Sequence, residues 1–266
     1  TDGYEWTTGY INAWNGYYNG QNPLPSYINN IAPYSDSWYK ELARRSTDPS
    51  LERVRINDKN QYEYFANTDW MDAFYKDFNY SHEHNISVSG GNQNADYYVS
   101  GRFYDQDGIY RVGDERYKQY NVRAKGNTRI RPWLRLNNNM DFTVVDYHQP
   151  MLYYSLQLPQ RMIEHGGQPI NPITNPDGRW TYAAVLNGYA GFAEGSSYQQ
   201  DDKFTMKDKL GIEIDVVKDV LKISGDLSYL FARNKRERVT NMYTGYRGPD
   251  TPITVNESQG STLENL

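Results

Sequence analysis

The feature that most constrains the fold is an alternation of apolar and polar residues that recurs along the middle of the chain. It occurs in six stretches, at about 84–91, 96–105, 116–130, 133–146, 203–217 and 220–233. Successive side chains of a β-strand point to opposite faces, so the pattern predicts strands with one apolar and one polar face. Several stretches exceed the usual strand length of about 5–6 residues, whereas a tilted membrane-crossing strand needs about 9–11. The pattern therefore favours strands that cross a membrane.

The connections between these stretches alternate in length. Short connections lie at about 91–95, 131–133 and 218–219, whereas longer ones lie at about 105–115 and 147–200. If the strands are antiparallel, all short turns fall at one end of the sheet and all long loops at the other. Outer-membrane β-barrels have this asymmetry. The alternative, a soluble secreted carbohydrate-binding β-sandwich, has no reason to sort its loops by length.

Composition excludes several other classes of protein. The chain has 28 Lys and Arg against 33 Asp and Glu, so it lacks the basic balance of a nucleic-acid binder. It has no Cys, which excludes a disulfide scaffold, a zinc knuckle and a thiol nucleophile. No signal peptide is visible, and no apolar run approaches the roughly 18 residues of a transmembrane helix. A membrane β-barrel stays compatible, because only every second strand residue must then be apolar.

The two ends of the chain lack this periodicity. Residues 1–83 are rich in Gly, Asn, Pro and Tyr, which predicts a long loop region with short helices. Short oxygen-bearing side chains predict helix starts near Ser35 and near Asp69, with the helices running to about Arg45 and Phe78. The polar tract at 234–266 is interpreted as the start of a further loop. The six strands at 84–233, with the long loop at 147–200, form the middle part.

An ordered set of motifs carries a resemblance to a known family. The motifs are NTDW at 67–70, HNISVSGG at 84–91, YYVS at 97–100, YDQDGI at 104–109, YNVRA at 120–124 and WL at 133–134. Together they resemble the SusC/RagA-type TonB-dependent outer-membrane transporters of Bacteroidetes. The similarity is close over about 67–146 and looser over 203–233.

The resemblance implies an all-β fold, in which this chain is a segment of an antiparallel up-and-down transmembrane barrel of about 22 strands. It also implies the import of nutrients, an oligosaccharide or other glycan by default, although peptide importers share the scaffold. The implied partners are a SusD-like surface lipoprotein, the TonB complex and outer-membrane lipid. The chain departs from the family in extent, because no plug and no TonB-contacting segment are visible. The resemblance therefore implies an internal segment that follows the plug.

No motif predicts catalysis, a cofactor or a metal. His82 and His84 lie two residues apart, but a metal site needs a third and a fourth ligand. An outer-membrane barrel enzyme, a third hypothesis, needs two carboxylates across a cleft. Asp114, Glu115, Asp201 and Asp202 are present, but nothing in the sequence pairs them. We therefore expect a protein that is not an enzyme.

Aromatic residues in the long loops are the candidates for contact with substrate or lid. A flat ring beside Asn or Asp suits a sugar, and the same rings also suit packing within the loop or against a partner. The selected candidates are Trp14, Tyr153, Tyr154, Trp180 and Tyr182, and Trp38 is counted among the exposed loop aromatics. Two further tryptophans, Trp70 and Trp133, are interpreted as membrane-interface residues.

Overall fold

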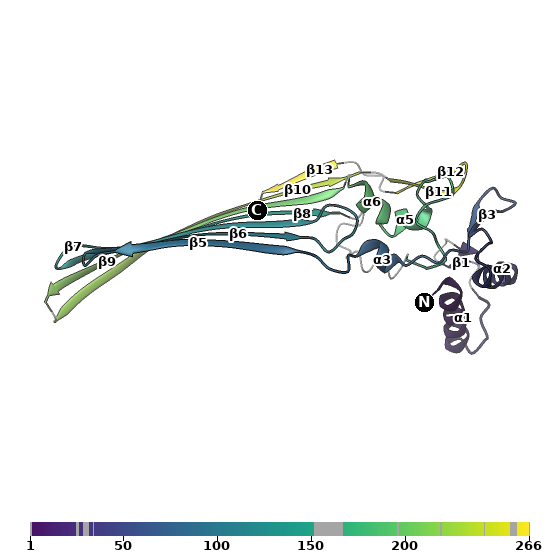
Figure 1. Cartoon of the computed structure of the whole chain (residues 1–266), viewed down its shortest axis with the longest axis horizontal. Coiled ribbons are helices and arrows are strands. Elements are labelled where there is room, and N and C mark those ends of the chain that lie inside the picture. Colours follow the sequence, from purple (N-terminus) through teal and green to yellow (C-terminus); the bar gives the residue numbers. More distant parts are fainter. Residues whose placement is uncertain are drawn as a thin grey trace.

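The computed structural model describes residues 2–24, 27–28, 32–33, 35–151, 167–195, 197–218, 220–241, 243–255 and 260–265. A long sheet occupies one part of the molecule, and helices with short strands gather at one of its ends (Figure 1). The described helices are α1 (Gly3–Tyr17), α2 (Asp36–Thr47), α3 (Trp70–Phe74), α5 (Tyr182–Leu186) and α6 (Tyr189–Glu194). Two-stranded sheets pair β1 (Tyr27–Ile28) with β2 (Ala32–Pro33), β3 (Val54–Ile56) with β4 (Tyr62–Tyr64), and β11 (Tyr243–Gly248) with β12 (Thr251–Val255).

The large sheet is antiparallel throughout and has the order β13-β10-β9-β8-β7-β6-β5. Its strands are β5 (Ser81–Gly91), β6 (Ala95–Asp107), β7 (Arg116–Arg131), β8 (Leu134–Pro150), β9 (Tyr198–Val217), β10 (Leu221–Thr240) and β13 (Gly260–Asn265). From β5 to β10 each strand pairs with the next along the chain, which is the up-and-down order. The six predicted strands are confirmed, and most extend beyond their predicted limits at the end near the helices. The described sheet is open and does not close into a barrel.

The ends of the sheet differ in the way that the connection lengths predict. The turns that join β5 to β6, β7 to β8 and β9 to β10 lie at one end, and the longer connections lie at the other (Figure 1). The first turn is tight because the Asn92 side-chain oxygen accepts hydrogen bonds from the backbone N–H groups of Asn94 and Ala95, at 2.8 and 3.0 Å. The described chain therefore has a turn end and a loop end.

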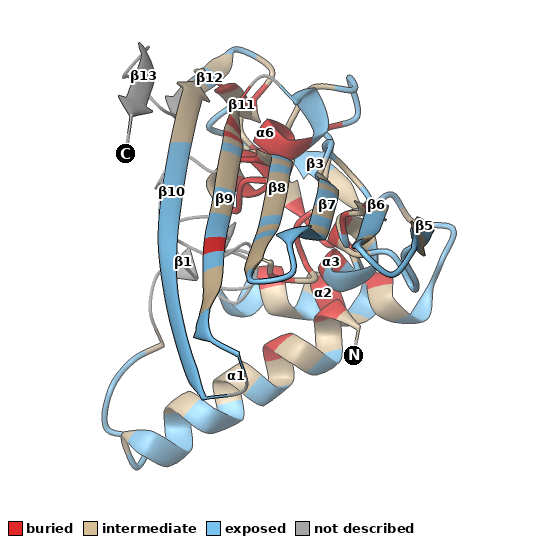
Figure 2. Ribbon diagram, turned by 90° about the vertical axis from the view of Figure 1, so that its left-hand side faces the viewer, coloured by how far each residue is buried: buried red, intermediate tan, exposed pale blue. Residues whose placement is uncertain are grey.

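Segments that are distant in the sequence pack together at the loop end, and we call this part the loop cap (residues 2–24, 35–80, 108–115, 167–195 and 243–253). In Figure 2 most buried residues lie on or around α2, α3 and α6, and few lie along the strands. One hydrophobic cluster joins Trp38, Leu42, Phe65 and Ile170, and a second joins Trp70, Phe74, Ala183, Ala184 and Phe192. The loop between β8 and β9 thus supplies part of both cores.

Side-chain caps fix the starts of the helices in the loop cap. The Ser35 hydroxyl accepts from the Trp38 backbone N–H at 3.2 Å, and Asp69 accepts from that of Asp72 at 3.0 Å. Both predicted helices are present, but the second ends at Phe74 rather than near Phe78. Helix α1 was not predicted, although Asp2 and Glu5 form a capping box at its start.

Two tryptophan predictions are wrong. Trp70 is 2 % exposed and its Nε1 donates to the Gln168 carbonyl at 3.0 Å, so it lies in the core of the loop cap and not at a membrane interface. Trp38 is 1 % exposed and donates to the Tyr64 carbonyl at 3.2 Å. Both were misplaced because the loop region has a core of its own. Trp133 is 50 % exposed at the β7–β8 turn, and its place at an interface stays a prediction.

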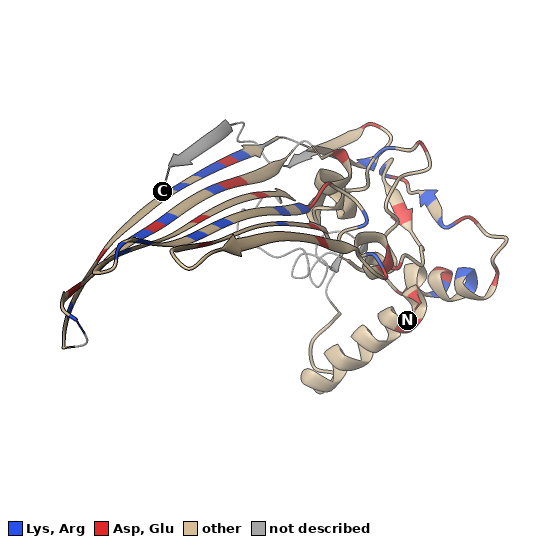
Figure 3. Cartoon of the chain, turned by 60° about the vertical axis from the view of Figure 1, so that its left-hand side comes forward, with Lys and Arg blue, Asp and Glu red and all other residues tan. Residues whose placement is uncertain are grey.

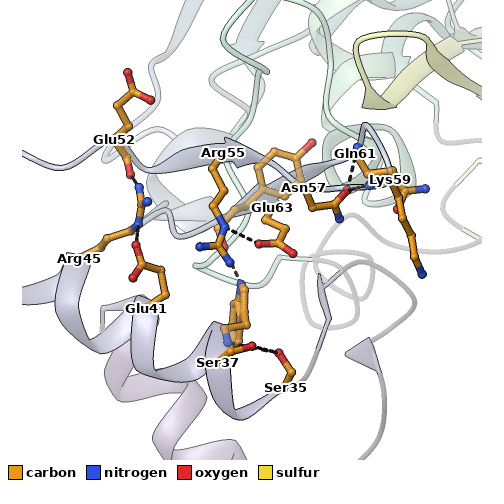
Figure 4. Close-up of polar contacts among 12 residues, drawn as sticks. Ser35, Ser37, Glu41, Arg45, Glu52, Arg55, Asn57, Lys59, Gln61 and Glu63 are labelled. Atoms are coloured by element: carbon orange, nitrogen blue, oxygen red, sulfur yellow. Dashed lines mark hydrogen bonds and ion pairs between the residues drawn. The ribbon is translucent and has the colours of Figure 1, made fainter.

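Ion pairs support the outer part of the loop cap (Figure 4). Glu41 on α2 accepts from Arg45 at 2.7 Å, and Glu63 on β4 accepts from Arg55 at 2.6 Å. The guanidinium carbons of Arg45 and Arg55 lie 4.7 and 5.3 Å from the Phe65 ring centre. Cation–π contacts therefore tie α2 and the β3–β4 hairpin to the same buried ring.

Candidate functional site

One face of the large sheet is apolar and uncovered. Register places apolar residues of neighbouring strands side by side, and many are exposed, from 39 % at Val99 to 78 % at Ile86. Others in this group are Val88, Tyr97, Tyr120, Val122, Leu210, Ile212, Ile223, Leu227 and Tyr229. The described residues place no second sheet over this face, so they do not form the β-sandwich that was the alternative. We call this surface the apolar band.

The apolar band ends at a row of polar residues near the loop end, which we call the polar collar. Two residues beyond Phe103 on the same face, Asp105 is 4 % exposed and accepts from Arg116 at 2.9 and 2.5 Å. Two residues beyond Val144, Asp146 accepts from Gln200 at 2.8 Å. On β8 the band runs from Leu134 to Val144, about eleven residues, which matches the roughly 9–11 that a strand needs to cross a membrane.

The opposite face carries charges of both signs, and they pair across strands. Figure 3 shows the basic and acidic residues spread along the neighbouring strands. Five cross-strand pairs lie at 2.7–3.3 Å: Arg102–Glu83, Arg123–Asp141, Arg135–Glu213, Lys222–Glu213 and Lys209–Asp226. Neutral hydrogen bonds link them, since Asn121 accepts from Gln119 at 2.9 Å and donates to Thr143 at 2.7 Å. We call this surface the polar face. In the five pairs, each charge lies beside one of opposite sign.

Two hollows lie on the polar face. One of about 520 Å³ spans β5 to β8 and is lined by Asn85, Ser100, Arg102, Gln119, Asn121 and Asp141 among others. A second of about 340 Å³ lies at the turn end, beside Asn92, Asn94, Asp96, Asn127, Arg135 and Asn137. Both present amides and charged groups to solvent. They suit a hydrogen-bonding ligand better than an apolar one.

Two of the predicted aromatic residues lie close together in the loop cap. Trp180 is half-buried, its Nε1 donates to Glu194 at 2.7 Å, and its ring centre lies 6.1 Å from that of Tyr189. Tyr182 begins α5, and the Arg247 guanidinium lies 4.2 Å from its ring centre. Both rings therefore take part in packing within the loop cap.

The other predicted aromatic residues are not brought to this place. Trp14 lies on α1, well apart from α5 (Figure 1), and contacts Tyr10 and Tyr18 with ring centres 6.3 and 4.7 Å away. Tyr153 and Tyr154 lie outside the described residues. Because Trp14 lies apart from Trp180 and Tyr182, the described part of the chain does not form a single aromatic platform from the predicted residues.

A polar network joins Trp180 to the rest of the loop cap. Asn175 is 3 % exposed, accepts from the Tyr64 hydroxyl at 2.7 Å and donates to the carbonyls of Trp180 and Tyr246 at 3.1 and 3.2 Å. Burial raises the pKa of Tyr64. The residues Asn-Pro-Asp-Gly at 175–178 predict a turn within the long loop. The turn is confirmed by the hydrogen bond from the Gly178 N–H to the Asn175 carbonyl at 2.9 Å. The network itself was missed.

Asp177 adds charge to this network. Hydrogen bonds from Arg179 lower the pKa of Asp177 to about 2, and the Tyr62 hydroxyl donates to the same carboxylate at 3.0 Å. The Arg179 guanidinium in turn lies 3.8 Å from the Tyr246 ring centre. Three chain segments, around Tyr62, Asp177 and Tyr246, therefore meet at one ion pair.

The described residues form no metal-binding cluster. No cluster of three His, Cys, Asp or Glu residues within them is arranged to hold a metal ion. Asp201 pairs with Arg236 at 2.6 Å on the polar face, whereas Asp202 lies in the polar collar, so these carboxylates point to opposite sides. Among the described helices, none is long and apolar enough to span a membrane.

Comparison with known proteins gives likenesses to solved structures only. No family model and no curated protein matches the chain. The structure of the RagAB peptide transporter is 19 % identical, with a TM-score of 0.47, over 76 % of this chain and 23 % of that one. The RagAB peptide importer in its closed-closed state is 17 % identical, with a TM-score of 0.48, over 88 % and 26 % of the two chains. In its open-open state it is 18 % identical, with a TM-score of 0.49, over 83 % and 24 %. The present chain spans about a quarter of the length of these structures.

Proposed function

We propose that this chain is part of a TonB-dependent importer in the outer membrane of a Gram-negative bacterium. In this proposal β5 to β10 are consecutive strands of a barrel of about 22 strands. The apolar band faces lipid and the polar face lines the lumen. The chain supplies wall and loops to the importer and has no enzymatic role.

One observation carries the proposal: the large sheet is a single layer whose apolar band is exposed and bounded by the polar collar. Large exposed apolar patches on a protein mark a surface that something else covers. A lipid bilayer covers a band of this height on every strand, and paired charges on the opposite face belong in water. The motifs that resemble SusC/RagA-type transporters point to the same class of protein.

The proposal also assigns the two ends of the sheet. The short turns lie on the periplasmic side, and the loop cap, which includes parts of 1–83 and 147–200, lies on the extracellular side. There it meets a SusD-like surface lipoprotein that holds the nutrient. Trp14, Tyr153, Tyr154, Trp180 and Tyr182 stay the candidates for contact with lipoprotein or substrate. An oligosaccharide is the proposed nutrient, because aromatic rings beside amides suit sugars.

This segment has no Cys, so an introduced Cys is the only thiol within it and allows a test of the lipid-facing surface. Single Cys substitutions at Leu227 and Ser228, adjacent residues on opposite faces of β10, are spin-labelled in the intact protein in lipid vesicles. We expect the label at 227 to collide with oxygen, which concentrates in lipid, and the label at 228 to collide with a water-soluble nickel complex. Equal exposure of both labels to the nickel complex would refute the membrane placement.

A second experiment tests transport itself. Cells that express the intact protein are given fluorescent oligosaccharides, with and without a functional TonB protein and with and without the proposed SusD-like lipoprotein. We expect uptake only when both are present. Uptake that is independent of TonB would contradict the proposed mechanism, and TonB-dependent uptake of peptides alone would contradict the proposed nutrient.

A further inference from the structure

Three neighbouring strands of the polar face carry the same short motif near the loop end. In each, a Tyr is followed two residues later by a Gln, and the two side chains share one face because they are two residues apart. The phenol oxygen lies 2.7 Å from the amide oxygen in Tyr104–Gln106, 2.9 Å in Tyr117–Gln119 and 3.1 Å in Tyr147–Gln149. The motif therefore occurs once in β6, once in β7 and once in β8.

The register of the sheet brings the three motifs side by side. Gln106 lies opposite Tyr117, and Tyr117 lies opposite Tyr147. The ring centres of Tyr104 and Tyr117 are 6.1 Å apart, and those of Tyr117 and Tyr147 are 6.0 Å apart. The rings are half-buried, so each keeps part of its surface open to the polar face. We call these six residues the Tyr–Gln ladder.

Each Tyr–Gln pair is arranged to bind an acceptor oxygen. Where the phenol donates to the amide oxygen, the amide nitrogen keeps its N–H groups for other partners. The Gln119 nitrogen uses one of them on Asn121, at 2.9 Å. Gln106 and Gln149 present theirs beside a ring. A ring next to a fixed amide donor is the combination that binds a sugar, since the C–H face packs on the ring and a hydroxyl accepts from the amide.

The surroundings of the ladder favour an uncharged ligand. Arg102 lies with its guanidinium carbon 5.3 Å from the Tyr104 ring centre and is itself paired with Glu83 at 2.7 Å. At the other side of the ladder, Asp201 is 6 % exposed and paired with Arg236 at 2.6 Å. The charges of Arg102 and Asp201 are thus already neutralised. The Glu115 carboxylate also reaches the ladder, and it is held by hydrogen bonds from the Tyr147 hydroxyl at 3.0 Å and the Ile109 backbone N–H at 3.1 Å. A charged ligand would have to displace these partners, whereas a neutral one would not.

The ladder also adjoins a hollow of suitable size. Gln119 and Arg102 line the hollow of about 520 Å³ that spans β5 to β8. Small-ligand sites in proteins usually have volumes of about 300–1,000 Å³. We propose that the Tyr–Gln ladder and this hollow form a binding site for a neutral oligosaccharide on the wall of the lumen. This inference rests on the proposed function and adds the place of the site and the absence of charge on its ligand.

The experiment measures binding by calorimetry to the intact protein in detergent micelles. The probes are three neutral oligosaccharides (maltoheptaose, cellohexaose and mannohexaose), one anionic oligosaccharide (hexagalacturonate) and a tryptic digest of casein. The variants are Tyr117→Ala and the double variant Gln106→Leu/Gln149→Leu, which removes two amides and keeps all three rings. The matched control is Tyr120→Ala, which removes a ring of the same strand from the opposite face. Circular dichroism shows whether each variant is folded.

We expect the wild type to bind at least one neutral probe more tightly than hexagalacturonate. Tyr117→Ala should weaken that binding about tenfold or more, as for other central aromatic residues in binding sites. The double Gln variant should weaken it at least threefold, and Tyr120→Ala less than twofold. If Tyr117→Ala does not fold, the double Gln variant gives the answer.

Two results would overturn the inference in different ways. If a neutral probe binds and the ladder variants bind it as tightly as the wild type, the site lies elsewhere and the proposed function stands. If the wild type binds only casein peptides, only hexagalacturonate or none of the probes, the proposal that the ligand is a neutral oligosaccharide is wrong. The membrane placement is tested separately by the spin labels.

Discussion

Asn138 on β8 donates a hydrogen bond from its side-chain amide to the carboxylate of Asp208 on β9, at 2.7 Å. Both side chains lie on the face that otherwise forms the apolar band, with Met140 directly opposite Asp208 and Leu210 directly opposite Asn138. The sequence pattern alone favours a strand end for Asp208, because a carboxylate interrupts an apolar face there, and it offers no explanation of Asn138. The first interpretation is wrong, because Asp208 lies midway along β9. The amide of Asn138 and the carboxylate of Asp208 satisfy each other's hydrogen bonding, which explains why both polar residues lie on the apolar face.

A double-mutant cycle tests this pair. Asn138→Leu leaves a carboxylate without its partner and should destabilise the protein by about 1–3 kcal/mol, and Asp208→Leu should cost less because it leaves a neutral amide. The double Leu variant should be about as stable as the wild type, since two apolar residues then replace a desolvated polar pair. The measurement is urea unfolding in lipid vesicles. Additive losses in the double variant would show that the two residues do not interact.

The apolar band predicts that an introduced charge has different effects on the two faces of β10. Leu227 is 71 % exposed, so in a water-soluble protein Leu227→Arg should change stability by less than about 0.5 kcal/mol. If the band faces lipid, the same substitution near the bilayer midplane should cost about 2–4 kcal/mol. The control is Ser228→Arg on the polar face of the same strand, which should cost little. Equal effects of the two substitutions on folding into lipid vesicles would argue against a lipid-facing band.

The packing of Trp180 changes what its substitution should do. Its ring contacts Tyr189 and its Nε1 binds Glu194, so Trp180→Ala should destabilise the loop cap by about 3 kcal/mol, the lower end of the range for core aromatic residues. Trp180→Phe keeps most of the packing and should cost about 1 kcal/mol for the lost hydrogen bond. Limited proteolysis of residues 167–195 measures both. A Trp180→Ala protein that resists protease like the wild type and binds nutrient less well would favour a direct contact with substrate instead.

The ion pair at Asp177 predicts a dependence of stability on pH. Arg179 lowers the pKa of Asp177 to about 2 in the folded protein, below the value of about 3.9 that the group has when unfolded. A lowered folded-state pKa stabilises the protein above the unfolded pKa, and the stabilisation is lost as the pH falls through the folded value. The stability difference between the wild type and Asp177→Asn should therefore be constant above about pH 5 and vanish near pH 2. Hydrogen exchange in the loop cap, measured from pH 7 to pH 2, checks this. A difference that persists unchanged at pH 2 would exclude the ion pair as its source.

The strands were predictable because their pattern is local. In a one-layer sheet, the alternation of apolar and polar residues depends only on which face each residue has. The sequence alone therefore assigns Ile212 to the apolar face and Glu213 to the polar face. The limits of the strands were less accurate at the loop end. There β9 continues back to Tyr198, and its outward residues become polar in the collar, so the alternation is lost although the strand continues.

The loop cap was not predictable in the same way because its core comes from distant segments. Ile170 packs with Trp38 and Phe65, and Phe192 packs with Phe74, over separations that no local pattern records. For the same reason Trp38 and Trp70 looked like exposed rings. Repetition was the signal that was missed on the polar face. On the polar face Tyr-x-Gln occurs at 104, 117 and 147, whereas a fourth copy, Tyr198–Gln200, lies on the opposite face of β9. The short turn between β7 and β8 sets the register that aligns 117 with 147, but the longer connection between β6 and β7 leaves the alignment of 104 open.

The length of β9 and β10 has a consequence for the height of the protein above the membrane. Each has 20 residues, whereas about 9–11 suffice to cross a bilayer. At about 3.3 Å per residue and a tilt near 40°, the remaining ten residues rise about 25 Å. In the proposed setting the wall of the pore therefore extends well above the lipid head groups. A nutrient enters it far above the bilayer, and the Tyr–Gln ladder, level with the polar collar, meets that nutrient before it reaches the depth of the membrane.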